Sequence, residues 1–257
     1  MTKHFSHKIK SVIILAKLEL AQRYKRSIVG VWWSLLNPLL TVFIFFFVFQ
    51  ELITIQGIVG IDYLIYIISG VIVVLFSIQT VTQLADSLAA KINLVTKIKL
   101  DPFLLTSGVL SAGVFNFFVA FVPFIVLLLF TIPFNFKLLL IFPLVVWMSF
   151  FLYSFGLLIA LAYALFDDAK PLIRIFISFL PYLTPVFYSI NQLPSNVKLV
   201  VELSPITIFL KYFRWTIDLE NDFNLRLFWI HFLALSALAS LFLYIFKKAW
   251  PEIVKAL

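Results

Sequence analysis

Side chains that could carry out acid–base or metal chemistry are scarce in this chain. The carboxylates near its long apolar stretches fall at the ends of those stretches: Glu51, Asp62, Asp86, Asp101, Asp167 and Asp168. The histidines are scattered, as His4, His7 and His231, and no group of His, Cys and carboxylate residues has the spacing of a metal site. A membrane enzyme or an ion-coupled carrier needs ionisable groups near the bilayer midplane. The sequence therefore predicts no catalytic site, no metal and no cofactor.

A nucleotide site is also missing from the sequence. The chain has no glycine-rich phosphate-binding loop, so it lacks the usual means of holding ATP. Any work that it performs must draw energy from a partner or from an ion gradient, and the missing midplane charges argue against a gradient. We therefore expect a chain without enzymatic activity of its own, whose ATP hydrolysis would occur in a separate subunit.

The densest group of polar side chains is a basic cluster near the start of the chain. Residues 23–38 read RYKRSIVGVWWSLLNP, in which Arg23, Lys25 and Arg26 precede two tryptophans and a long apolar run. This order is typical of a chain that passes from the cytoplasm through lipid headgroups into hydrocarbon. Gly30 lies between the two groups, where it would let the chain bend sharply into the first span.

Composition places the whole chain in a bilayer. Hydrophobic residues make up 63% and charged residues 12% of the 257 positions, and the mean hydropathy is +1.10, whereas a soluble domain carries about 25% charged residues. A span needs about 20 apolar residues. Six runs of that length are present, at 29–52, 63–84, 103–132, 138–166, 171–190 and 225–246. We predict an all-α membrane protein with six transmembrane helices in a single transmembrane domain over residues 1–257, and a kink at Pro123.

The basic residues set the orientation of these spans. Most of the 20 Lys and Arg residues fall on one side if the N-terminus is cytoplasmic, as the positive-inside rule requires. Both termini are therefore expected in the cytoplasm. The net charge of +8 is explained by this placement and by anionic lipid headgroups, so we expect no nucleic-acid partner.

Two segments outside the spans are predicted to form helices on the cytoplasmic side. Residues 5–26 form the first, an amphipathic interface helix, whose apolar stripe is expected to comprise Ile9, Val12, Ile13, Ala16, Leu20 and Tyr24. The second is the loop 86–102, where apolar residues three apart lie among lysines. That loop could dock a soluble motor or could simply connect two spans along the lipid surface.

A segment before the last span is too apolar for a plain loop and too rich in proline for a span. We predict that residues 191–224 form a re-entrant outer hairpin of two short helices, roughly 196–203 and 206–218. Irregular backbone at membrane depth must be covered by protein or line a water-filled cavity. The hairpin would therefore gate an exit path, although an apolar loop that caps the bundle is the alternative.

Aromatic side chains are the remaining candidates for binding. Sugar rings can pack on aromatic faces, and five such residues could line a channel or gate: Trp32, Tyr182, Tyr188, Tyr212 and Trp215. Tyr and Trp near membrane interfaces also anchor helices, and the sequence leaves both roles open.

Four stretches carry a family resemblance. The string RYKRSIVGVWWSLLNPLL resembles the opening signature of the type-2 ABC exporter permeases for polysaccharides, and INLVTKIKLDPFLL resembles their coupling loop. Phe166, Asp168 and Arg174 resemble a family turn, with Asp167 where Arg is usual. LTPVFYSINQLP and SPITIFLKYFRW resemble the outer hairpin, with Ser204 in place of Asn. The resemblance covers essentially the whole chain.

The resemblance implies a job and partners. Two copies would pair as a homodimer, each on an ATP-binding ABC subunit, and would pass a lipid-linked polysaccharide across the cell inner membrane. The cargo could be an O-antigen of lipopolysaccharide, a capsule or a teichoic acid. The lipid headgroup would enter at Arg23, Lys25, Arg26 and Gly30, although the three basic residues could also be a plain positive-inside anchor. Coupling to the ATPase would use Lys91, Ile92, Val95, Ile98 and Asp101.

Two other functional classes remain open from the residues alone. A membrane glycan-processing enzyme would need a catalytic carboxylate or histidine in a sizeable loop. A passive channel or scaffold would need no motor subunit at all.

Overall fold

The computed structural model describes residues 2–25, 29–49, 61–92, 95, 97, 100–131, 135–166, 168–220 and 222–256. These residues form helices and connecting segments and no strand, so the predicted all-α class is confirmed. The helices in chain order are α1 (Thr2–Tyr24), η1 (Gly30–Trp32), α2 (Trp33–Phe49), α3 (Ile61–Ala90), α5 (Pro102–Thr131), η2 (Phe136–Leu140), α6 (Ile141–Leu165), α7 (Ala169–Ser178), α8 (Leu180–Leu183), η3 (Ile190–Gln192), α9 (Ser195–Leu203), α10 (Pro205–Thr216) and α11 (Leu225–Ala256).

Four stretches of helix in the described residues are long and apolar enough to cross a membrane: Asp62–Ala90, Pro102–Thr131, Phe136–Leu165 and Leu225–Lys255. They coincide with the second, third, fourth and sixth predicted spans. The first predicted span appears as the 17-residue α2, and its last residues lie outside the described chain. Four of the six predicted crossings are thus present as long helices.

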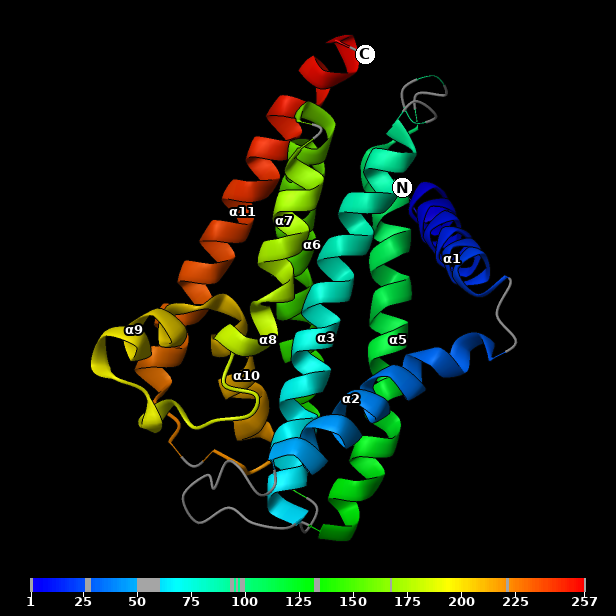
Figure 1. The fold of residues 1–257 in the computed structure, drawn as a ribbon. Helices are drawn as coiled ribbons and strands as arrows, with labels where there is room; N and C mark the ends of the chain where they lie inside the picture. The colour runs from blue at the N-terminus through cyan, green and yellow to red at the C-terminus, as the bar shows by residue number, and fades with distance from the viewer. Residues whose placement is uncertain are drawn as a thin grey trace.

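The long helices pack around α3, which runs through the middle of the bundle (Figure 1). It contacts both α5 and α6, while α11 packs on α6, and α2 crosses α3 and α5 obliquely. A Cβ added at Gly156 of α6 would lie 2.9 Å from Leu84 Cδ1 and 3.0 Å from Leu84 Cβ of α3. The absent side chain at Gly156 therefore sets the close α3–α6 approach.

The fifth predicted span, 171–190, is not one continuous helix. Helix α7 ends at Ser178, and α8 holds only four residues before the chain becomes extended at Thr184. Pro181 has no N–H to donate back along a continuous helix, and its ring would clash with the carbonyl four residues earlier. Pro185 disfavours helical backbone at Thr184. The prediction of a single helix was wrong because these two prolines act together.

Helix α1 occupies most of the segment predicted as an interface helix, and its location in the interface stays a prediction; only part of the expected apolar stripe is covered. Val12, Ala16 and Leu20 lie toward the bundle, whereas Ile9 and Ile13 are exposed. The side facing α5 is centred on Leu15, because Gly108 of that helix allows a close approach. A Cβ there would lie only 2.6 Å from Leu15 Cβ. Tertiary packing, and not the apolar pattern of α1 alone, therefore decides which face is covered.

The two helices expected in the hairpin are observed as α9 and α10, with bounds within two residues of those predicted. They lie toward one end of the bundle (Figure 1). The C-terminus of the chain and the C-terminal end of α3 lie at the opposite end. A proline precedes or begins each helix, Pro194 before α9 and Pro205 at the first position of α10. Proline is favoured at the start of a helix because its missing N–H would have no partner there.

Candidate functional site

Of the residues predicted to receive the lipid headgroup, Arg23 is bonded to another helix and Lys25 is exposed. Arg23 Nη2 donates to Gln83 Oε1 of α3 over 2.7 Å, so its guanidinium is bound to the bundle. Lys25 is exposed, and Arg26 lies outside the described residues. Gly30 has a φ of +60°, the left-handed region that favours glycine. The chain therefore turns at Gly30 before α2 begins.

The predicted coupling loop folds back onto the bundle. Val95 is 2% exposed, and its N–H donates to Lys91 O over 2.9 Å, which forms a helical turn. Ile92 is half-buried against the core. Asp101 Oδ1 accepts from Phe103 N at the start of α5, and Ile98 lies outside the described residues. The apolar side chains of this loop that are described face inward, and Lys97 is exposed.

Ion pairs hold the same end of the molecule together. Lys91 Nζ lies 3.2 Å from Glu19 Oε2 and joins the end of α3 to α1. Asp86 pairs with Lys170 over 2.9 Å and with Arg174 over 2.7 Å, which joins α3 to α7. The sequence identified Arg174 as part of a turn but did not identify its partner Asp86, which lies 88 residues earlier.

The five predicted aromatic residues do not form one site. Trp32 is 68% exposed, and Tyr182 is also exposed. Tyr188 OH donates to Tyr182 O over 3.1 Å, a contact within one segment. Tyr212 and Trp215, by contrast, line the same cavity of about 260 Å³ between α6, α10 and α11.

Six of the eleven residues that line that cavity are aromatic. Trp147, Phe228 and Phe232 line it beside Tyr212 and Trp215. The Tyr212 hydroxyl lies 2.8 Å from His231 Nδ1 and so joins α10 to α11. Tyr212 and Trp215 thus pack on Phe228 and Phe223 within this chain, and their role in a channel or gate stays a prediction.

The strongest polar anchor of the hairpin is Arg214, a residue that sequence reasoning did not assign to a site. It is 3% exposed on α10. Its Nε donates to Ser69 Oγ over 3.2 Å, Nη2 to Tyr66 O over 3.1 Å and Nη1 to Pro185 O over 2.8 Å. The guanidinium carbon also lies 3.4 Å from the centre of the Tyr66 ring. One side chain thus joins α10 and α3 to the broken segment after α8.

Tyr66 extends this anchor. Its hydroxyl donates to Tyr188 O over 2.9 Å, so the irregular segment 184–188 is held near both ends. Gly70, one turn further along α3, has room for this segment only because it lacks a side chain. An added Cβ would lie 2.9 Å from Val186 Cγ1 and 3.0 Å from Val186 Cα. The only signal in the sequence was the arginine near the end of the SPITIFLKYFRW motif.

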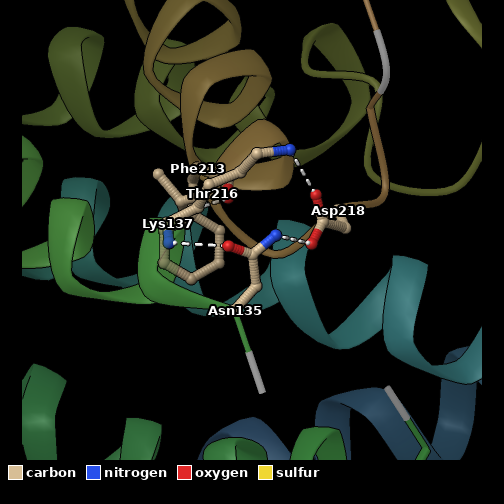
Figure 2. Close-up of polar contacts among 5 residues, drawn as sticks. All are labelled: Asn135, Lys137, Phe213, Thr216 and Asp218. Carbon is tan, nitrogen blue, oxygen red and sulfur yellow. Dashed lines mark hydrogen bonds and ion pairs between the residues drawn. The ribbon is translucent and has the colours of Figure 1, made fainter. Parts of the chain in front are cut away.

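A second contact latches the end of α10 to the turn between α5 and α6 (Figure 2). Lys137 Nζ donates to Asp218 Oδ1 over 2.6 Å, and Asn135 Nδ2 donates to Asp218 Oδ2 over 2.8 Å. Asp218 has a φ of +57°, uncommon for a residue other than glycine. The hydrogen bond from Lys137 lowers the pKa of Asp218 below its usual value. We call these three residues the latch.

A larger, polar cavity of about 790 Å³ lies between the hairpin and the start of α11. Its wall includes Tyr66 and Arg214 of the anchor, and it adds residues from η3, α9, α10, α11 and the loop that follows α10: Asn191, Glu202, Thr207, Lys211, Glu220, Asp222 and His231. Burial raises the pKa of the Glu220 carboxyl. Within the described part of the chain, no three His, Cys, Asp or Glu side chains are placed to hold a metal ion. The cavity can offer donors and acceptors to a polar, uncharged ligand.

The sequence is similar to those of known transport proteins. Residues 10–217 match the family described as ABC-2 type transporter. An O-antigen export system permease protein RfbA of Klebsiella pneumoniae is 23% identical over 199 residues, which cover 76% of this chain and 75% of that protein. A second Klebsiella pneumoniae protein of the same name is 22% identical over 206 residues, with the same coverage of both chains. The family match spans α1 to the end of α10, and the chain therefore belongs to the ABC-2 type transporter family.

Proposed function

We propose that this chain is the permease subunit of an ATP-driven exporter that moves a lipid-linked polysaccharide across the cytoplasmic membrane. The observation that carries the proposal is the match to two O-antigen export permeases over about three quarters of each chain. The hairpin α9–α10 also supports it, because Arg214 holds the hairpin to Pro185 at the end of the bundle opposite the C-terminal end of α3. In this proposal two copies form the channel, and each binds one ATP-hydrolysing subunit.

The same proposal completes the topology. The chain crosses the membrane six times, with α2 and the α7–α8 segment supplying the first and fifth crossings, and both termini are cytoplasmic. Helix α1 lies in the inner interface. The hairpin α9–α10 re-enters from the outer side and is held by Arg214 and the latch. The broken fifth crossing is compatible with a bilayer because Arg214 and Tyr66 satisfy carbonyls of its irregular segment.

Deletion of the gene tests the function directly. Surface polysaccharide should disappear and its lipid-linked form should accumulate inside the cell, and the wild-type gene should restore export. Unchanged surface polysaccharide in the deletion strain would refute the proposal. Loss of the polymer without intracellular accumulation would indicate a synthetic enzyme and would also refute it.

The headgroup role rests on a charge cluster and needs a matched control. We propose that Arg23, Lys25 and Arg26 receive the diphosphate of the lipid carrier through charge-assisted hydrogen bonds. Replacing all three by Gln should abolish export while the ATPase still assembles with the permease. The control replaces the exposed lysines of α1, Lys8, Lys10 and Lys17, by Gln, with the same change of charge. Equal export by the two triple variants would exclude a specific role for the cluster.

The docking role of the loop 86–102 is best tested at its exposed lysine. Lys97→Glu reverses a charge that is already solvated and should reduce retention of the ATPase subunit in a detergent pull-down. Val95→Asp would bury a carboxylate at a 2% exposed site and should destabilise the permease itself. Lys255→Glu, at an exposed site near the C-terminus, is the matched control. Full retention of the ATPase by Lys97→Glu would contradict docking through this residue.

A further inference from the structure

The cavity of about 790 Å³ between the hairpin and α11 has charged side chains of both signs on its wall. Glu220 and Asp222 form no ion pair with any described residue, and neither does Lys211. Glu202 has one weak partner, Lys198, at 3.9 Å. The wall thus carries three carboxylates against two cations, and the charges of Arg214 and Lys211 both act on Glu220.

The one fully buried cation on the wall is already occupied. Arg214 uses Nε, Nη1 and Nη2 on Ser69, Pro185 and Tyr66. Apart from His231, Lys211 is the one other described lining residue whose positive charge could meet a ligand anion. A phosphate or polyanion site is normally built from several Arg or Lys donors that no protein group occupies, and the described wall offers only Lys211 for that purpose.

A buried hydroxyl also points to a polar ligand. Thr207 is 3% exposed and lies on the cavity wall, and its Oγ1 has no hydrogen-bond partner among the described residues. Buried hydroxyls are normally hydrogen-bonded. Together with Asn191 and the two carboxylates, Thr207 supplies acceptors and donors at separate points along this cavity. Sugar hydroxyls are both donors and acceptors, and charged acceptors bind them more strongly than neutral ones.

The size of the cavity fits the same class of ligand. Small-molecule sites usually enclose about 300–1,000 Å³, and this cavity lies in the upper part of that range. It extends from η3 at Asn191 to the first turn of α11 at Leu227. A short run of sugar units could occupy it lengthwise.

We propose that this cavity binds a segment of the exported glycan through sugar hydroxyls, and that the bound units are uncharged or cationic, not anionic. The proposal rests on the export function proposed above and narrows it. Glu220 and Asp222 are the residues that select against a polyanionic polymer such as one with a phosphodiester backbone. The site is distinct from the aromatic cavity around Trp147, which offers few polar groups.

Cysteine labelling in cells tests occupancy. The chain has no cysteine, so single variants react without background. Asn191→Cys and Leu227→Cys place a thiol on the wall, and Val200→Cys places one on the exposed surface of α9 outside the cavity. With the full exporter, reaction with a membrane-impermeant maleimide should fall at least fivefold at 191 and 227 when the cell makes its polysaccharide. It should not change at 200. Equal labelling in cells with and without polysaccharide would overturn the proposal, and so would an equal fall at all three positions.

Removal of charge tests the selectivity. The double variant Glu220→Gln, Asp222→Asn keeps shape but loses two charged acceptors, and its export should fall about tenfold. The control Glu252→Gln removes an exposed carboxylate near the C-terminus. Unchanged or increased export by the double variant would overturn the proposal, because a polyanionic cargo would be helped by the loss of two negative charges.

The outcomes separate this inference from the general function. If deletion of the gene leaves surface polysaccharide intact, the export function is refuted. If deletion abolishes export while the cavity variants export and label as the wild type does, only the glycan site is refuted.

Discussion

Replacement of Arg214 by Lys should loosen the hairpin without removing the charge. Arginine reaches Ser69, Tyr66 and Pro185 at once because its donors are spread over a planar fork. An ammonium group is a single point and can keep at most one of these distant acceptors in place. A hydrogen bond to a charged group contributes about 1.5–3 kcal/mol, so loss of two costs about 3–6 kcal/mol. At 3 kcal/mol the open population rises roughly 100-fold.

The labelling rate of a buried thiol can measure this opening. Thr184→Cys is a suitable reporter, since Thr184 is fully buried beside Pro185 and its hydroxyl has no partner among the described residues. The reporter reacts only when the segment leaves the bundle, so its rate in excess reagent follows the open population. Purified protein carrying Arg214→Lys should react about 100-fold faster than the reporter alone.

The matched control is Arg226→Lys at an exposed site on the first turn of α11. It makes the same chemical change and should alter the rate by less than about twofold, since exposed substitutions usually change stability by under about 0.5 kcal/mol. If Arg214→Lys reacts within threefold of the control, Arg214 does not hold the segment closed, and the assignment of the anchor is refuted.

Two other contacts give predictions of different kinds. Gly108→Ala should destabilise the protein by about 1–3 kcal/mol, because its Cβ would lie 2.6 Å from Leu15 Cβ, whereas the nearest atom to a Cβ at Gly113 is 3.3 Å away. Gly113→Ala should therefore lower the thermal midpoint less, and equal losses would contradict close α1–α5 packing. At the latch, the pKa of Asp218 is lowered in the folded state by Lys137. The ion pair stabilises the folded protein by at most about 1 kcal/mol, because it is partly exposed. This stabilisation is present above the pKa of Asp218 in the unfolded chain, about 3.9, and is lost as the pH falls through the lower pKa of the folded state. The difference in thermal unfolding midpoint between wild type and Asp218→Asn should be constant from pH 7 to 5 and should become smaller below pH 4. A difference in midpoint that vanishes by pH 6 would be incompatible with this contact.

Much of the fold could be read from local signals. The long apolar runs predict α3, α5, α6 and α11 because each helix satisfies its own backbone and needs only length and apolar side chains to cross a bilayer. The prolines at 194 and 205 set the starts of α9 and α10 to within two residues. Family membership also follows from short motifs along one chain, without any knowledge of packing.

The same local signals were ambiguous where two effects compete. Residues 171–190 are apolar enough for a span, yet Pro181 and Pro185 interrupt the helix. Mean hydropathy over the segment does not detect such a break, because it averages the prolines with their apolar neighbours. In α1 the apolar residues occupy more than one face, so periodicity alone could not select the side centred on Leu15. In the coupling loop, spacing suggested an apolar docking face, but Val95 is buried in the bundle.

The amino-acid sequence by itself determined the helices, their apolar character and the absence of a recognisable nucleotide site. Tertiary structure decided which polar groups meet. Arg214 contacts Ser69 and Tyr66 across 145 and 148 residues, and Asp218 contacts Lys137 across 81. No periodicity spans such separations, because these partners are chosen by the packing of whole helices. The polar cavity exists only once α9, α10 and α11 are in place around those contacts.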